Sequence, residues 1–172
     1  MPATVARSCR YPVKALSVQD IDQAELIPGE GVPGYRRFAL AHGTTRFDTL
    51  EPTWLPNTSF LSLGKNERLA ALDTEYDADT GTLTVFRDAK RVVSGKITTP
   101  LGRSVLGDFF SAYMRKDGSG PVRLVEAPGI MFTDRPEKSV SIVGLTSVRD
   151  LERVAGALVD PIRFRANIYL DG

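Results

Sequence analysis

The chain has 172 residues, which suffices for one domain or two small ones, with a buried core that needs no disulfide or structural metal. Its 22 basic and 21 acidic residues leave a formal net charge of +1, and this balance argues against a general nucleic-acid or membrane-surface binder. The single cysteine, Cys9, excludes an internal disulfide and a site with several cysteine ligands. Because the sequence has no apolar run of membrane-spanning length and no signal-peptide core, we expect a soluble cytoplasmic protein.

The N-terminal part of the chain is predicted to hold two extended segments and a loop. Partial alternation predicts a first strand over residues 5–13, and apolar residues indicate a second extended segment over 18–27. Residues 28–34 (PGEGVPG) form a loop with the G-x-G-x-x-G spacing of dinucleotide-binding sites. We reject that function because a proline interrupts the motif and a strand, not a helix, is expected after it. The glycines are predicted to serve turns.

A strand expected over residues 35–41 (YRRFALA) contains two arginines near its start. Because neighbouring side chains in a strand face opposite ways, only one of Arg36 and Arg37 can point into a shared pocket. His42, the single histidine, is expected in the next turn, so a histidine metal cluster or a Ser-His-Asp site has little support. Trp54 lies in an irregular loop with two prolines, and we interpret it as a packing anchor.

The middle of the chain is predicted to be rich in strands and to end in a helix. Short apolar stretches separated by polar turns follow one another over residues 60–93, which is typical of an antiparallel meander in a barrel-like or sandwich sheet. Thr99 and Pro100 then form a helix start, with threonine as the cap. One face of this helix is apolar and is predicted to be core: Val105, Leu106, Phe109, Phe110, Tyr113 and Met114.

A flexible break over residues 116–120 (KDGSG) is the best candidate for a domain boundary, so we expect one domain over 1–120 and a second over 121–172. After short strands over 122–125 and 140–143, a second helix is predicted, capped by Thr146 or Ser147, with Asp150 completing a capping box with Ser147. Such a junction directs backbone N–H groups towards an anion, although every helix has a cap. The apolar stripe predicted to bury this helix is Val148, Leu151, Val154, Ala155 and Leu158.

The closing segment, residues 160–172 (DPIRFRANIYLDG), contains the strongest candidate binding residues. In an extended chain Arg163, Arg165 and Asn167 would share one face, and Phe164 would lie on the other. Guanidinium groups bind phosphate and other oxyanions bidentately, so this face suits an anion. The alternative is that the arginines pair with carboxylates on a solvated face. A strand that ends two residues before Gly172 also leads us to expect a longer protein.

Five short stretches, with their order and spacing along the chain, resemble one known family: residues 11–14 (YPVK), 34–40 (GYRRFAL), 132–134 (FTD), 140–148 and 163–167 (RFRAN). The family is MOSC, named for the C-terminal domain of molybdenum cofactor sulfurase, and it includes the mitochondrial amidoxime-reducing component and bacterial relatives. The resemblance implies a mainly β, α+β fold. An antiparallel barrel-like β domain with two packed helices would precede an incomplete MOSC β-barrel.

What the resemblance implies for function is molybdenum cofactor binding. By matching position, the residues that would bind the phosphate and pterin of the cofactor are Lys14, Arg36, Arg165 and Asn167, with Thr146 and Ser147 adding contacts from the helix start. Together with Arg163, these residues would bring cations and donors to an anionic ligand, and hydrogen bonds to charged groups contribute roughly 1.5–3 kcal/mol each. We expect Lys14, Arg36, Arg165 and Asn167 to converge on one site.

The chain departs from the family pattern at several positions. Tyr35 stands where aspartate is usual, Ala15 where the amidoxime reducers have serine, and Ala166 where proline is frequent. In the family, the molybdenum-ligating cysteine lies well beyond the Arg-Phe-Arg-x-Asn segment, and no cysteine follows this segment up to Gly172. Cys9 is the sole thiol, and we expect it to be a small buried hydrophobe.

Two classes of function remain open. The intact protein is expected to be an oxidoreductase or a sulfur carrier with a thiolate-ligated molybdenum, served by an electron-transfer or sulfur-donor protein, while the 172-residue chain alone is expected to be inactive. The alternative is a non-catalytic β-domain binding module for a substrate or a partner protein, with structural arginines. The family is also associated with pyridoxal phosphate, but no lysine stands out as a Schiff-base residue among Lys14, Lys65, Lys90, Lys96, Lys116 and Lys138.

Overall fold

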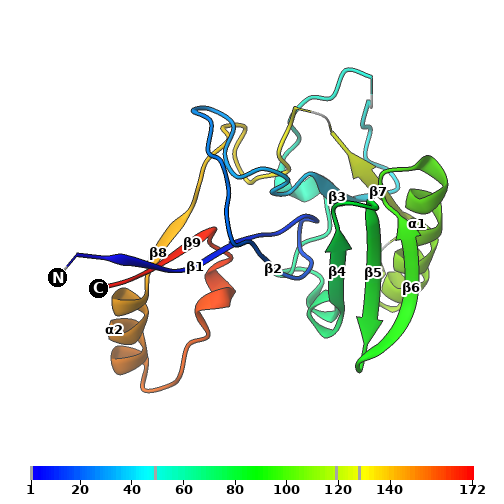
Figure 1. The fold of residues 1–172 in the computed structure, drawn as a ribbon. Coiled ribbons are helices and arrows are strands. Elements are labelled where there is room, and N and C mark those ends of the chain that lie inside the picture. Colours follow the sequence, from blue (N-terminus) through cyan, green and yellow to red (C-terminus); the bar gives the residue numbers. More distant parts are fainter. Residues whose placement is uncertain (1, 49, 119, 128) are drawn as a thin grey trace.

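The computed structural model describes residues 2–48, 50–118, 120–127 and 129–172. Within these ranges the chain is a mixed α+β fold, with most of its strands in open sheets and with two α-helices. Figure 1 shows a three-stranded sheet with one helix at one end of the molecule and a sheet containing both chain ends, with the other helix, at the opposite end. The expected α+β class is confirmed. None of the described sheets closes into a barrel, so the barrel detail is not confirmed.

The three-stranded sheet matches the later part of the predicted antiparallel meander, whereas residues 67–71, within its earlier part, form a 3-10 helix. The sheet consists of β4 (Asp73–Asp77), β5 (Thr82–Arg87) and β6 (Lys90–Lys96), in that order. Asp88 and Ala89 make the tight turn between β5 and β6, and both have positive φ. The meander was predictable because its strands are short, consecutive and joined by polar turns.

Helix α1 (Pro100–Met114) begins and packs as the sequence predicts. The Thr99 hydroxyl accepts a hydrogen bond from the backbone N–H of Gly102 at 3.2 Å, which satisfies one of the free donors of the first turn. Leu106, Phe110 and Met114 are fully buried in the largest apolar core. Of the predicted stripe only Val105 is largely exposed.

The strand after the expected domain boundary is attached to the segment before it. Strand β7 (Val122–Glu126) pairs antiparallel with β3 (Phe38–His42), and α1 packs against both β7 and β6. His42 is the last residue of β3 rather than a turn residue. The division at residue 120 stays a prediction, but residues 122–126 are packed against elements of the first segment.

Both chain ends meet in a four-stranded sheet with the order β2 (Gln19–Asp20), β1 (Thr4–Arg10), β9 (Ile168–Asp171) and β8 (Ile142–Gly144). Strand β1 runs antiparallel to β9, and β8 runs parallel to β9. Figure 1 shows the N and C termini side by side at this sheet. Pairing of the first and last strands fixes the closing segment against the start of the chain.

The first three extended segments are shorter than predicted. The first ends at Arg10 instead of residue 13, the second is reduced to the two residues of β2, and the third begins at Phe38. For the third segment the reason is local, because Arg36 has positive φ, which an extended strand cannot accommodate; Ala15, in the turn after the first segment, has positive φ too. These two positions become important at the candidate site.

Helix α2 (Leu145–Ala155) differs most from its prediction. Its N-cap is Gly144, with no side-chain capping bond, so Thr146 and Ser147 lie inside the first turn and the expected cap and capping box are wrong. Only Val148 is buried in the helix, and the rest of the expected stripe is exposed, with Leu158, just beyond the helix end, 93% exposed. Periodicity indicates which side chains share a face, and here no described element covers most of that face. None of the described helices is both long and apolar enough to cross a membrane.

Candidate functional site

Lys14 is held in a turn after β1 and is almost completely buried. Its backbone N–H donates to the carbonyl of Phe38 at 2.8 Å, which ties the turn to β3. Its amino group donates to the carbonyl of Phe132 at 2.9 Å and to a carboxylate oxygen of Asp134 at 3.0 Å. Burial lowers the pKa of this amino group; Asp134 opposes the effect, and the charges of Arg36 and Arg165 lower the pKa further.

Arg36 approaches the same carboxylate from the start of the third segment. One of its terminal nitrogens lies 3.5 Å from Asp134, while its Nε is buried and has no hydrogen-bond partner among the described residues. The backbone around it is tightly held, since its N–H donates to Tyr11 and its carbonyl accepts from Phe132. The guanidinium carbon lies 5.2 Å from the centroid of the Tyr35 ring. Arg36 is therefore fixed in place with part of its donor capacity unused.

Arg165 reaches this site from the other end of the chain. It follows a short 3-10 helix, Pro161–Phe164, and adopts a left-handed conformation with φ 52°. One terminal nitrogen donates to the carbonyl of Leu16 at 2.8 Å, and the guanidinium carbon lies 4.0 Å from the centroid of the Tyr11 ring. Burial lowers the pKa of Arg165, and repulsion from Arg36 adds to this effect. The guanidinium nevertheless remains charged near neutral pH.

These three cations line one hollow of about 130 Å³, which we call the cation pocket. Its wall contains a single carboxylate, so the lining side chains carry an excess of two positive charges. Such an excess in a half-buried hollow favours an anionic ligand, because repulsion among the cations is relieved when a negative charge enters. The lining residues are Lys14, Ala15, Arg36, Asn57, Ser62, Leu63, Asp134 and Arg165.

Backbone strain is concentrated at the cation pocket. Among the described residues, five that are not glycine have positive φ, and three of these, Ala15, Arg36 and Arg165, line the pocket. A left-handed conformation costs a side-chain-bearing residue about 1–3 kcal/mol, and it persists only where the surrounding contacts enforce it. The other two residues form the β5–β6 turn, where positive φ is ordinary.

Three of the four residues expected to converge do so, and the fourth does not. Asn167 is buried outside the cation pocket, where its side-chain oxygen accepts bonds from the backbone N–H and hydroxyl of Ser141, and its amide donates to the carbonyl of Cys9 at 3.3 Å. These bonds join β1 to the residues before β8. In this structure Asn167 therefore holds the sheet together.

The other predicted binding residues also lie away from the cation pocket. Arg163 is exposed within the 3-10 helix. The prediction that Arg163 and Arg165 share one face of a strand is therefore wrong. The chain turns there because the Asp160 cap and Pro161 begin a helical turn. The Thr146 hydroxyl donates to the carbonyl of Gly172 at 2.8 Å, and Ser147 is exposed on α2. None of these residues lines the cation pocket, and their role in cofactor binding stays a prediction.

Asp134 is the pocket residue that the sequence reasoning missed. Burial alone would raise the pKa of its carboxyl, but the hydrogen bond and charge of Lys14, with the charge of Arg36, outweigh burial and lower it. The signal was present in the FTD motif, since buried cations need a carboxylate and this motif supplies one. Trp54 donates to the carbonyl of Thr133 at 3.1 Å, which supports its interpretation as a loop anchor.

The described residues include no group of three or more His, Cys, Asp or Glu side chains that could hold a metal ion. Cys9 is fully buried in β1, its thiol faces the carbonyl of Ala166 at 3.2 Å, and burial raises its pKa. The thiol therefore stays protonated near neutral pH. The expectation that Cys9 is a small buried hydrophobe is confirmed.

Comparisons with protein-family models, curated proteins and solved structures gave no match. The resemblance to the MOSC family therefore depends on the short stretches quoted above. The cation pocket is defined by the positions of its lining residues and does not depend on that resemblance.

Proposed function

We propose that this chain binds an oxyanion in the cation pocket, and that the oxyanion is the phosphate of a pterin cofactor of the molybdenum cofactor type. The observation that carries the proposal is the convergence of Lys14, Arg36 and Arg165 on one hollow with a single carboxylate. The buried, unpartnered Nε of Arg36 supplies a donor for a ligand oxygen. Guanidinium and ammonium groups together suit a phosphate, which has several oxygens to accept their bonds.

A purely structural role explains this arrangement poorly. The Lys14 side chain is only 5% exposed and the Arg36 side chain 13%, so both have lost most of their hydration. Asp134, which faces both, is 64% exposed and is shared between them. Removing cations from water costs several kcal/mol each unless partners compensate. One shared carboxylate compensates two buried cations incompletely, and an anionic ligand would complete the pairing.

The fit to the molybdenum cofactor divides into two parts. The phosphate end fits, because the pocket offers cations and a free donor. The described residues offer no exposed thiolate for the metal, since Cys9 is buried. When bound, this cofactor supplies oxygen-atom or sulfur-transfer chemistry, so an intact MOSC protein would be an oxidoreductase or a sulfur carrier. The proposal also assigns the open sheets of this chain to the barrel-like domains of the MOSC family. It further expects that an electron-transfer or sulfur-donor protein in the cytoplasm is the partner.

Titration with inorganic phosphate and pyrophosphate tests the anion site directly. Isothermal calorimetry on the wild-type chain should give saturable binding, tighter for pyrophosphate. Arg165→Ala should weaken binding about tenfold or more, because a charge-assisted hydrogen bond contributes about 1.5–3 kcal/mol and about 1.4 kcal/mol is tenfold in affinity. Arg163→Ala is the matched control, since Arg163 is exposed two residues earlier and outside the pocket. Equal losses in both variants, or no binding by the wild type, would reject the site.

Stability measurements on the same variants separate a binding site from a structural role. If Arg165 only supported the fold, Arg165→Ala would lower the melting temperature while phosphate affinity, scaled to folded protein, stayed the same. Purification from a host that makes molybdenum cofactor, followed by analysis for pterin and molybdenum, tests the cofactor itself. Phosphate binding without any bound pterin would support the anion site and contradict the cofactor assignment.

A further inference from the structure

A second and larger cavity is lined by the two segments that also contribute Arg36 and Asp134 to the cation pocket. It has a volume of about 580 Å³ and is bounded by parts of residues 25–37 and 126–138. We call it the apolar pocket, after the side chains that form most of its wall. Cavities of about 300–1,000 Å³ are typical of small-molecule sites. Its apolar wall residues are Ile27, Pro33, Tyr35, Ala127, Ile130 and Met131.

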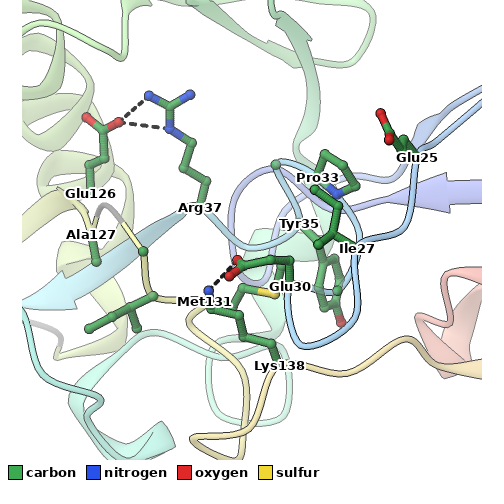
Figure 2. A pocket seen from close by; sticks show the side chains of 14 residues that line it. Glu25, Ile27, Glu30, Pro33, Tyr35, Arg37, Glu126, Ala127, Met131 and Lys138 are labelled. Carbon is green, nitrogen blue, oxygen red and sulfur yellow. Dashed lines mark hydrogen bonds and ion pairs between the residues drawn. The ribbon is translucent and has the colours of Figure 1, made fainter.

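Four of the five charged side chains of the lining form two ion pairs, and the fifth, Glu25, is exposed. Figure 2 shows Arg37 facing Glu126 on one side and Lys138 facing Glu30 across the pocket, near Met131. The Arg37 nitrogens lie 2.8 and 2.5 Å from one Glu126 oxygen, and the Lys138 amino group lies 2.5 Å from Glu30. Both lining cations already have carboxylate partners, so an anionic ligand would have to disrupt one of these pairs, and the apolar wall favours an uncharged ligand.

Apolar side chains at the mouth of the apolar pocket are exposed to water. Ile27 is 58% exposed although it lines the pocket, and its neighbour Leu26 is 48% exposed. Of the lining glycines, Gly129 has positive φ and leaves open space beside it, because no atom lies within 4 Å of the position that a Cβ would take. An apolar ligand would cover the exposed mouth and occupy this space.

We propose that the apolar pocket binds an uncharged, apolar small molecule with a body of one or two rings. The cavity volume sets the size, the apolar wall sets the chemistry, and the ion pairs that occupy both lining cations disfavour an anion. This site is separate from the cation pocket, with which it shares no lining residue, and it does not depend on the proposed function.

The test uses 6-propionyl-2-(dimethylamino)naphthalene, an uncharged two-ring fluorophore whose emission shifts to the blue in apolar surroundings. Titration into the wild-type chain should give saturable binding of one probe per chain with a blue shift. Ile130→Trp fills the pocket and should weaken binding at least tenfold. Ile27→Ser changes only the exposed mouth, so it should fold normally and should still weaken binding severalfold. Absence of saturable binding by the wild type would overturn the proposal.

Two controls identify the location and the charge preference. The exposed face of α2 is the competing apolar surface, and Val154→Ser alters it at a residue that is 87% exposed. Val154→Ser should leave probe affinity unchanged; a loss there with retention in Ile27→Ser would overturn the assignment. The anionic dye 1-anilinonaphthalene-8-sulfonate should bind at least tenfold more weakly, and equal affinity would contradict the preference for an uncharged ligand. Inorganic phosphate should not displace the uncharged probe, and displacement would contradict two separate sites.

Discussion

The guanidinium of Arg165 lies over the ring of Tyr11, with its central carbon 4.0 Å from the ring centroid. Tyr11 in turn meets Tyr35 edge to face at 6.4 Å between centroids, and Arg36 lies over Tyr35. Two arginines separated by most of the chain are thus each placed over one ring of a tyrosine pair. This arrangement fixes the directions of both cations before any ligand arrives, which lowers the cost of ordering them on binding.

Replacing Arg165 by lysine should therefore lower stability. Lysine keeps the charge but loses the planar group that lies over Tyr11 and the directed bond to the carbonyl of Leu16. We expect the free energy of unfolding to fall by about 1–2 kcal/mol in urea denaturation. Arg163→Lys, at an exposed position nearby, should change it by less than about 0.5 kcal/mol. Equal effects of the two changes would show that the ring contact contributes little.

Asp134→Asn should move stability and ligand affinity in opposite directions. The change removes the charged partner of the buried Lys14, so we expect unfolding to become easier by about 1–3 kcal/mol at neutral pH. It also removes the one negative charge from the wall of the cation pocket, so phosphate should bind more tightly. Denaturation and calorimetry on one preparation measure both quantities. Weaker phosphate binding in a folded variant would contradict the proposed site.

Asp134 should also contribute to acid sensitivity. Its pKa is lower in the folded chain than the ordinary value of 3.8, so between these values the unfolded chain binds more protons. Its contribution to stability is fully present above about pH 4 and is lost as the pH falls through the folded-state pKa. Urea midpoints should fall less steeply for Asp134→Asn than for the wild type as the pH is lowered from 5 to 2. Parallel curves would show that other carboxylates control this range.

The two helix starts should respond differently to the same substitution. Thr99→Ala removes the cap of α1 and should cost about 1 kcal/mol, within a usual range of about 0.5–2. Thr146 lies within the first turn of α2 and makes no capping bond, so Thr146→Ala should have a smaller effect, limited to its exposed bond to Gly172. Thermal unfolding followed by circular dichroism compares the two. A larger loss for Thr146→Ala would contradict the assigned cap positions.

Cys9 should be protected from thiol reagents in the folded chain. It is completely buried in β1, and burial raises its pKa, so both access and thiolate content are low. Ellman's reagent should react at least about 100-fold more slowly in buffer than in strong denaturant. Rapid reaction without denaturant would show that β1 separates readily from its neighbours.

The predictable parts of the fold are the elements that depend on residues close together in the sequence. The meander of β4 to β6 and the capped helix α1 each depend on strand length, turn composition or a cap within a few residues. Helix α2 forms where the apolar periodicity predicts a helix. Its predicted burial fails, because burial depends on which other element covers the apolar face, and periodicity does not show this. Pairing of β3 with β7 and of β1 with β9 carries no local signal.

The candidate site was predictable in part for a different reason. Lys14 and Arg36 are named from a resemblance, Arg165 from both that resemblance and strand alternation, and the structure brings the three together. Arg163 was named from strand alternation, which failed because Arg165 adopts positive φ after a 3-10 turn. Nothing in the identity of an arginine reveals a left-handed backbone, since surrounding contacts impose it. Asp134 was missed because its partners are distant in sequence.

The pairing of β1 with β9 also has a consequence during synthesis. Strand β1 is made long before its partner β9, since Val5 pairs with Leu170 and Ser8 with Ile168. Until then one edge of β1 has no partner, whereas the β4–β6 meander and α1 can form as soon as they emerge. Translation should therefore produce a structured segment from β4 to α1 before β1 joins β9, and a nascent chain arrested before Ile168 should leave Cys9 open to alkylation.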